Sequence, residues 1–180
     1  IGLGKMGANV ARRLMEKGWQ VVGFNRTGKI TEELEKEGLT GSYSLNEFVN
    51  KLSKPRIVWL MLPAGDPIDK MLFGKEGLVK LLEKGDIVID AGNSFYKDSI
   101  VREKRLRTLG IKFVDVGISG GPSGARYGAS LMVGGDKDTF EKLYPLYRDL
   151  AVSGGAQFFE GAGAGHFVKM IHNGIEYGMM

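Results

Sequence analysis

Four side chains near the end of the chain have the types and the spacing of an acid–base site. At about 100° per residue, Lys169, His172, Asn173 and Glu176 share one side of a predicted helix. Two helical turns, about 10 Å along the axis, separate Lys169 from Glu176. That separation is too long for a direct ion pair, but it suits a base and an acid acting at opposite ends of a small substrate.

The same segment also fits an ordinary amphipathic helix. Its other side carries Phe167, Val168, Ile171, Ile175 and Met179. Periodicity alone favours a solvated polar face with a weak contact between His172 and Glu176. A lysine desolvated against the rest of the protein would instead have a lowered pKa and would act as a base. Neither histidine of the chain has further metal ligands at a suitable spacing, so a metal site is not expected.

The start of the chain, Ile1-Gly2-Leu3-Gly4-Lys5-Met6-Gly7, has a dinucleotide-binding glycine pattern. The first glycine allows a tight turn, the second lets the backbone approach a pyrophosphate, and the third lets the following helix pack on the strand. The amides at that helix N-terminus face the anion. The alternative is a purely structural turn, which the amphipathic segment that follows makes less favourable.

The next strand indicates which dinucleotide is bound. Enzymes that use NAD typically end this strand with an acid that bonds the ribose 2′-hydroxyl. Here the strand ends in Asn25-Arg26-Thr27, with Lys29 close behind. A guanidinium is a bidentate partner for a 2′-phosphate, so the sequence favours NADP, with NAD possible. The alternative for Arg26 is a solvated turn arginine.

Two later strand ends are expected to line the same cofactor. Leu62-Pro63-Ala64-Gly65 ends one strand and Ala91-Gly92-Asn93-Ser94 ends the next. Small residues there leave room for a ribose and a nicotinamide. Asn93 would place an amide where cofactor and substrate meet; a helix-start asparagine is the alternative.

A third loop, Gly117-Ile118-Ser119-Gly120-Gly121, matches the G-x-S-x-G elbow of serine hydrolases. An elbow requires a helix directly after the serine, and Pro122 with three glycines predicts a poor helix. We therefore expect an anion-binding loop, in which the Ser119 hydroxyl and the amides of Gly120 and Gly121 face a carboxylate or hydroxyl. A simple glycine-rich turn is the alternative.

Short apolar strands that alternate with amphipathic helices must position these residues. Strands are predicted at 1–3, 20–24, 56–62, 86–90, 112–116, 130–133 and 157–159, and helices at 6–17, 30–37, 45–52, 78–83, 97–108 and 137–150. This order predicts an α/β fold with a Rossmann-like doubly wound parallel sheet over residues 1–162. Residues 163–180 are predicted to begin a long helix that leads into an all-α C-terminal domain missing from the sequence.

Bulk properties exclude several classes of protein. The net charge of the chain is only +4, and the basic residues are scattered along it, so nucleic acid is not an expected partner. No apolar run is long enough for a membrane span. The chain has no cysteine, which excludes disulfides and thiol catalysis and fits a cytoplasmic protein.

Taken together, these segments resemble the decarboxylating 6-phosphogluconate dehydrogenases, of the wider β-hydroxyacid dehydrogenase group. The resemblance covers essentially all 180 residues. It rests on the glycine turn, on Asn25-Arg26-Thr27, on 86–94, on 119–121, on 124–128 and above all on 163–178. Relatives that act on small hydroxyacids such as 3-hydroxyisobutyrate usually carry K-x-x-N-N, whereas this chain has His172 before Asn173.

The resemblance implies NADP-dependent oxidative decarboxylation of 6-phosphogluconate to ribulose 5-phosphate. In this family's mechanism Lys169 takes the C3 hydroxyl proton and Glu176 protonates the enediol at C1. Residues implied to hold the substrate's carboxylate and hydroxyls are Asn93, Ser119, Gly120, Gly121, His172 and Asn173, and Tyr177 is implied to hold its phosphate. The family's missing helical domain completes the phosphate site and forms a homodimer. A 3-hydroxyacid dehydrogenase and a non-catalytic nucleotide-binding module remain as alternatives.

Overall fold

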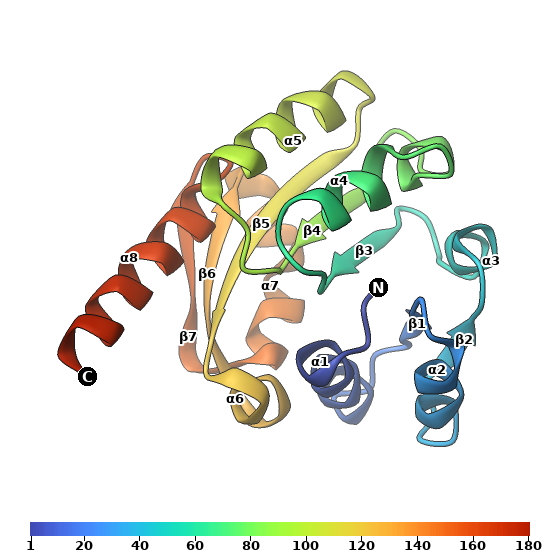
Figure 1. Ribbon diagram of the computed structural model, residues 1–180, viewed down its shortest axis with the longest axis horizontal. Coiled ribbons are helices and arrows are strands. Elements are labelled where there is room, and N and C mark those ends of the chain that lie inside the picture. The colour runs from blue at the N-terminus through green and yellow to red at the C-terminus, as the bar shows by residue number, and fades with distance from the viewer.

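The computed structural model describes residues 1–180 as eight α-helices and seven strands (Figure 1). The strands are β1 (Val22–Phe24), β2 (Thr40–Ser42), β3 (Ile57–Leu60), β4 (Ile87–Asp90), β5 (Lys112–Ser119), β6 (Ala129–Gly135) and β7 (Ala151–Glu160). The helices are α1 (Lys5–Glu16), α2 (Gly28–Glu35), α3 (Leu45–Asn50), α4 (Asp66–Phe73), α5 (Tyr96–Thr108), α6 (Gly121–Tyr127), α7 (Lys137–Leu150) and α8 (Ala164–Met179), with a 3₁₀ turn at Leu78–Lys80. None of these helices is long and apolar enough to cross a membrane.

The strands form a mostly parallel arrangement. β1 pairs with β2, and a five-stranded sheet has the order β3-β4-β5-β6-β7. All neighbours are parallel except β5 and β6, which run antiparallel. The predicted Rossmann-like, mostly parallel sheet is therefore confirmed, with one antiparallel pair that the sequence did not predict. A short link through α6 allows the antiparallel return, whereas a parallel return needs a longer crossover.

Residues 1–3 join the two groups of strands. The Gly2 amide donates to the Phe24 carbonyl of β1 at 3.0 Å, and the Met61 amide beyond β3 donates to the Ile1 carbonyl at 2.9 Å. The predicted first strand is thus hydrogen-bonded on both sides, although it is too short to count as a regular strand. It completes one continuous layer from β2 to β7.

Helices cover both faces of the sheet, as the predicted fold class requires. A small apolar core lies between α1 and α2. Of the two large cores, one lies under α1, α6 and α7, and the other lies under α3, α4 and α5. Strand β4 supplies both: Ile87 and Ile89 enter the first core and Val88 enters the second. Side chains on both faces of β4 are buried, which explains why this strand is apolar throughout.

Four elements differ from those that the sequence predicts. Helices α4 and α6 and strand β2 were not expected, and the predicted helix at 78–83 is only a 3₁₀ turn. Both unexpected helices carry a proline in their first turn. Proline is compatible with that position because the amide it lacks has no partner within the helix there.

Candidate functional site

The glycine turn has the geometry that each glycine was expected to provide. Gly2 has a φ of +87°, which side-chain-bearing residues rarely adopt. A Cβ on Gly7 would overlap the Gly2 carbonyl, so this glycine lets α1 start directly against the turn. A Cβ on Gly4 would meet nothing within 4 Å, which leaves the start of α1 open to an approaching anion.

Asn25 and Arg26 have different surroundings at the end of β1. The Asn25 side chain accepts from the Leu3 amide at 3.0 Å and donates to the Thr27 carbonyl at 3.2 Å, so it braces the glycine turn. Arg26 is exposed and forms no hydrogen bond or ion pair within the chain. Thr27 is exposed as well, so Arg26 is the one charged side chain of the three that is available to a ligand.

The loops after β3 and β4 lie beside each other at the carboxyl ends of the sheet. A Cβ on Gly92 would lie 2.7 Å from the Leu62 carbonyl, so the two backbones are in direct contact. Pro63, Ala64 and Asn93 are all exposed. In open α/β sheets ligands bind along this edge, so the structure brings these expected cofactor residues to a suitable place.

The loop at the end of β5 is followed by helix α6, which contradicts the expectation of a poor helix after Ser119. The predicted absence of a helix after Ser119 was wrong, but a histidine and an acid that follow Ser119 in the chain, His166 and Asp136, have other partners and do not form a catalytic triad with it. The His166 Nδ1 atom lies 2.8 Å from the Ser99 hydroxyl, and Asp136 caps α7 through the Thr139 amide. Ser119 has no histidine partner.

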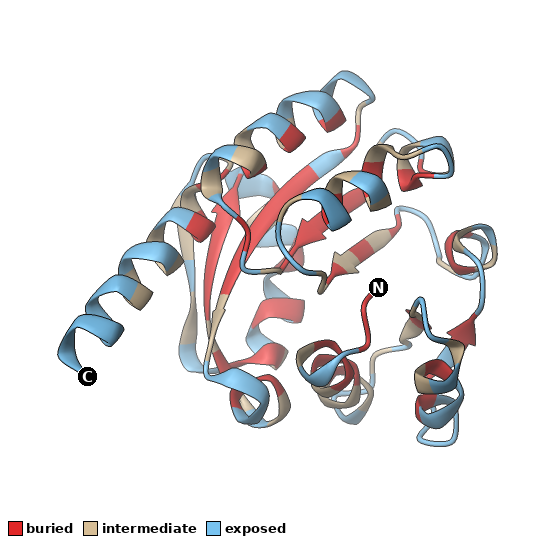
Figure 2. Ribbon diagram, in the orientation of Figure 1, coloured by how far each residue is buried: buried red, intermediate tan, exposed pale blue.

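Helix α8 is buried at its start and exposed towards its end (Figure 2), and its polar side is less exposed than its apolar side. Lys169, His172 and Asn173 are half-buried, whereas Met170, Ile171, Ile175 and Met179 are exposed. The predicted helix is confirmed, but the simple amphipathic interpretation with a solvated polar face is wrong for these three residues. Glu176 and Tyr177 lie further along, where the helix projects from the domain and both are exposed.

Three glycines allow α8 to approach the sheet closely. A Cβ on Gly117 of β5 would lie 2.9 Å from the Lys169 Cγ and still closer to its Cβ. Cβ atoms on Gly134 of β6 and Gly165 of α8 would overlap backbone atoms across the same contact. Lys169 is therefore seated against the backbone of β5, two residues before the Ser119 loop.

Burial lowers the pKa of Lys169 below its usual value, and nearby Glu176 opposes this shift. A lowered pKa makes the neutral amine more accessible, as a general base requires. The His172 Nδ1 atom lies 3.5 Å from the Glu176 carboxylate, which confirms the expected contact one turn apart. The inward side of α8 thus presents a desolvated lysine followed by two polar side chains and an exposed acid.

A buried carboxylate anchors the start of α8. Asp115 of β5 accepts from the Gly163 amide at 2.7 Å and from the His166 amide at 2.8 Å. Burial holds the pKa of the Asp115 carboxyl above its usual range, although His166 and these amides pull it down. Sequence reasoning missed Asp115; its one available signal was a charged residue inside an otherwise apolar strand.

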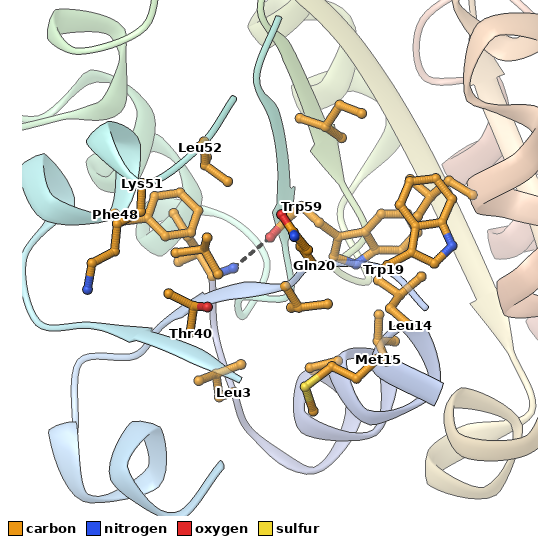
Figure 3. A pocket seen from close by; sticks show the side chains of 18 of the residues that line it. Leu3, Leu14, Met15, Trp19, Gln20, Thr40, Phe48, Lys51, Leu52 and Trp59 are labelled. Atoms are coloured by element: carbon orange, nitrogen blue, oxygen red, sulfur yellow. Dashed lines mark hydrogen bonds between the residues drawn. The ribbon is translucent and has the colours of Figure 1, made fainter. Parts of the chain in front are cut away.

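A cavity of about 910 Å³ extends away from the carboxyl edge of the sheet, although Gly2, Leu3 and Gly7 are among its lining residues (Figure 3). It surrounds the Ile1 amine, which donates to the Trp59 carbonyl at 2.8 Å, and is lined by side chains such as Trp19, Phe48 and Lys51. This space is at the amino ends of β1 and β3. Ligands of such sheets bind at the opposite edge, so we do not assign the cavity to the cofactor.

The fold and the glycine turn place this chain in the class of Rossmann-like dinucleotide-binding domains. The family described as the NAD binding domain of 6-phosphogluconate dehydrogenase matches residues 1–167. The chain therefore belongs to the 6-phosphogluconate dehydrogenase family and contains its NAD-binding domain.

Individual relatives agree with this assignment. The chain is 48% identical to YqeC of Bacillus subtilis, provisionally named a 6-phosphogluconate dehydrogenase, over 100% of this chain and 59% of the relative. It is 43% identical to the NAD(+)-dependent, decarboxylating 6-phosphogluconate dehydrogenase of the same species, over 100% of this chain and 40% of the relative. Among solved structures, the chain aligns with the 6-phosphogluconate dehydrogenase of Plasmodium falciparum at a TM-score of 0.91 and 36% identity. The alignment covers 99% of this chain and 40% of that one. The Plasmodium structure is described as including complexes with NADP+ and with 6-phosphogluconate. The chain thus spans between about two fifths and three fifths of these relatives.

Proposed function

We propose that this chain is the cofactor-binding part of an enzyme that oxidatively decarboxylates 6-phosphogluconate to ribulose 5-phosphate and carbon dioxide, with NADP as oxidant. The observation that carries this proposal is the inward polar side of α8. Lys169 is desolvated against β5, has a lowered pKa and lies on the helix turn before His172 and Asn173. A nucleotide-binding module without catalysis has no use for such a lysine.

In the proposed reaction the nicotinamide, when bound, supplies the hydride acceptor. Neutral Lys169 takes the proton of the C3 hydroxyl as the C3 hydride leaves, which gives a carbonyl β to the carboxylate. This carbonyl accepts the electron pair when the bond to the carboxylate breaks and carbon dioxide departs. Glu176 then donates a proton to C1 of the enediol. The distance of about 10 Å along α8 between Lys169 and Glu176 suits action at different carbons of an extended sugar acid.

The remaining expected substrate residues come from three parts of the chain. Asn93 lies in the loop after β4. Ser119 ends β5, Gly120 comes next, and Gly121 begins α6. His172, Asn173 and Tyr177 are on α8. We assign Tyr177 to the phosphate and the others to the carboxylate and hydroxyls. The exposed amide of Asn93 and the half-buried hydroxyl of Ser119 support this assignment, since neither forms a side-chain hydrogen bond within the chain.

NADP is proposed over NAD because of Arg26. Its exposed guanidinium has no partner in the chain and follows the strand that normally carries the ribose-binding acid. The relatives include an NAD(+)-dependent enzyme, so family membership alone does not decide the question. Arg26→Asp should weaken NADPH binding far more than NADH binding. Lys142→Asp, the same charge change at an exposed position of α7, should leave the ratio of the two affinities unchanged. An unaltered ratio in Arg26→Asp would remove this assignment.

The exposed apolar side of α8 supports a further part of the proposal. We propose that residues 163–180 begin a C-terminal helical domain of the full-length protein, which would cover Met170, Ile171 and Ile175 and form a homodimer. The Phe167 ring already packs edge-on against Tyr96 of α5 at 5.1 Å, so the outward side is in contact with protein only at its start.

The central test uses the full-length protein. Absorbance at 340 nm should rise with 6-phosphogluconate and NADP, and Lys169→Met should abolish the rise while nucleotide still binds. Turnover of 3-hydroxyisobutyrate in place of 6-phosphogluconate would assign the enzyme to the small-hydroxyacid branch. Nucleotide binding without turnover of either acid would favour a non-catalytic module and would refute the proposal.

A further inference from the structure

A fully buried arginine, Arg102 of α5, lies beneath the carboxyl ends of β3 and β4. Its side chain is 1% exposed, and that of its partner Asp90 is 0% exposed, with 3.2 Å between Nη1 and Oδ2. Its Nε and Nη2 atoms also donate to the two oxygens of Asp69, at 2.9 and 3.0 Å. Burying such charges costs solvation energy that their attraction only partly returns, so stability alone is a weak reason for this arrangement.

Further hydrogen bonds of Arg102 and Asp90 hold two loops. Arg102 donates through Nη2 to the Gly65 carbonyl at 3.2 Å, in the loop that ends β3. Asp90 accepts from the Gly92 amide at 3.1 Å and from the Ser94 hydroxyl at 2.9 Å, in the loop that ends β4. Both loops are therefore tied to one buried ion pair.

The two loops also contact each other directly. Gly92 approaches the Leu62 carbonyl so closely that a Cβ would lie 2.7 Å from it. Gly65, which precedes α4, has a φ of +81° and is held by Arg102 in this conformation. Because the loops touch and share the buried pair, a displacement of one must displace the other.

We propose that Arg102 is a positioning residue that fixes the loops 62–65 and 91–94 relative to each other so that they bind the dinucleotide together. It acts through Asp90 and through the Gly65 carbonyl. This inference rests on the proposed function in one respect, that these loops line the cofactor. Arg102 belongs to none of the segments that carry the family resemblance.

The fold supplies a matched control at the opposite end of β4. Arg56 and Asp86 form a second buried ion pair, with 2.9 Å between Nη1 and Oδ2 and side-chain exposures of 8% and 2%. This pair ties the amino ends of β3 and β4, away from both loops. Removing either arginine leaves a buried carboxylate without its partner, so Arg102→Met and Arg56→Met should destabilise the protein comparably.

The experiment compares these two variants, and Ser94→Ala, in the 180-residue chain. NADPH and NADH are titrated by fluorescence, and exchange of the Gly92 amide is followed by NMR. Arg102→Met should raise both dissociation constants by about tenfold or more, and Arg56→Met by less than about threefold. Protection of the Gly92 amide should fall in Arg102→Met beyond its fall in Arg56→Met.

Each outcome decides the proposal. Equal effects of Arg102→Met and Arg56→Met on binding and on Gly92 exchange would overturn it. If the unaltered chain binds neither nucleotide, the proposed function fails, and Gly92 exchange alone then decides whether Arg102 orders the loops. If Arg102→Met does not fold, Ser94→Ala decides: weaker nucleotide binding with unchanged unfolding supports the shared network, and wild-type binding refutes it.

Discussion

The contact between Gly117 and Lys169 gives the sharpest test of how helix α8 is positioned on the sheet. In Gly117→Ala the new methyl group would lie 2.9 Å from the Lys169 Cγ, 3.1 Å from the Gly165 carbonyl and closer still to the Lys169 Cβ. Neither the Lys169 Cβ nor a backbone carbonyl can swing away, because both are fixed by the path of the helix. Either α8 must lift from β5 or the strand must move.

The size of the effect follows from these distances. Carbon contacts are optimal at about 3.5–4.0 Å, so α8 must move by about 1 Å. Overpacking of this kind costs about 1–3 kcal/mol. The same movement would stretch the bonds from the Gly163 and His166 amides to Asp115, now 2.7 and 2.8 Å, beyond hydrogen-bonding range. We expect a total loss of about 2–4 kcal/mol in the free energy of unfolding.

Urea unfolding of the 180-residue chain measures this loss, and competitive amine labelling read by mass spectrometry measures the reactivity of Lys169. Gly174→Ala is the matched control on the same helix, since a Cβ there meets nothing within 4 Å. It should stabilise the chain by about 0.5–1 kcal/mol, as alanine does in a helix interior. In the full-length enzyme a shift of about 1 Å should lower kcat on the order of a hundredfold. If Gly117→Ala unfolds within about 0.5 kcal/mol of the wild type and labels identically, the close-approach reasoning is wrong.

Three further outcomes are expected. Asp115→Ala leaves two buried amides at the start of α8 without an acceptor, so urea unfolding should show a loss of about 2–5 kcal/mol; a loss below about 1 kcal/mol would contradict the anchor. Burial alone would raise the pKa of Asp86, but the amides of Glu83 and Arg56 and the Arg56 guanidinium lower it below 3.8. The ionised form therefore stabilises the fold above that pH and is lost as the pH falls through the folded pKa, so Asp86→Asn should flatten the acid side of the stability curve; an unchanged acid slope would refute this. The labelling of Lys169 should be half-maximal at a pH below 10.5, because burial lowers its pKa, and a midpoint at or above that pH would argue against its role as a base.

Helix α8 shows both the reach and the limit of the sequence. Its period separates Lys169, His172 and Asn173 from Phe167, Ile171 and Ile175 without ambiguity. Periodicity does not say which side meets the domain, and the usual preference is for the apolar side. Glycines of β5 and β6 decide which side of α8 faces the sheet, because they let the Lys169 side approach closely. They are distant from α8 in sequence, so this contact is visible only once the strands are paired.

The sequence does not predict helices α4 and α6, because proline and glycine in these segments count as helix breakers. Pro67 and Pro122 lie in the first turns of α4 and α6, where proline has little cost. Gly124 lies inside α6, and a Cβ there would come within 3.4 Å of the Ser119 carbonyl. Close packing on the preceding loop thus offsets the low intrinsic helix propensity of this segment. Helix propensities summed over neighbouring residues do not include such packing.

Buried acids in the strands were visible, but their partners were not. The sequence shows Asp86, Asp90 and Asp115 within apolar strands, which indicates that each has a polar partner. Those partners are as distant as His166, 51 residues from Asp115. Spacing rules work within one helix or strand, so they identified the glycine turn and the face of α8 and could not identify these cross-links.

The short connection through residues 1–3 joins two groups of strands that carry different parts of the proposed site. Arg26 lies on the side of β1, α2 and β2, whereas Lys169 and the loops held by Arg102 lie on the side of β3 to β7. On the proposed roles, a design that replaces only the end of β1 and the start of α2 with those of an NAD-dependent relative would change the choice of dinucleotide and leave Lys169 and the two loops in place. Cofactor preference in this family would then be free to evolve independently of its chemistry.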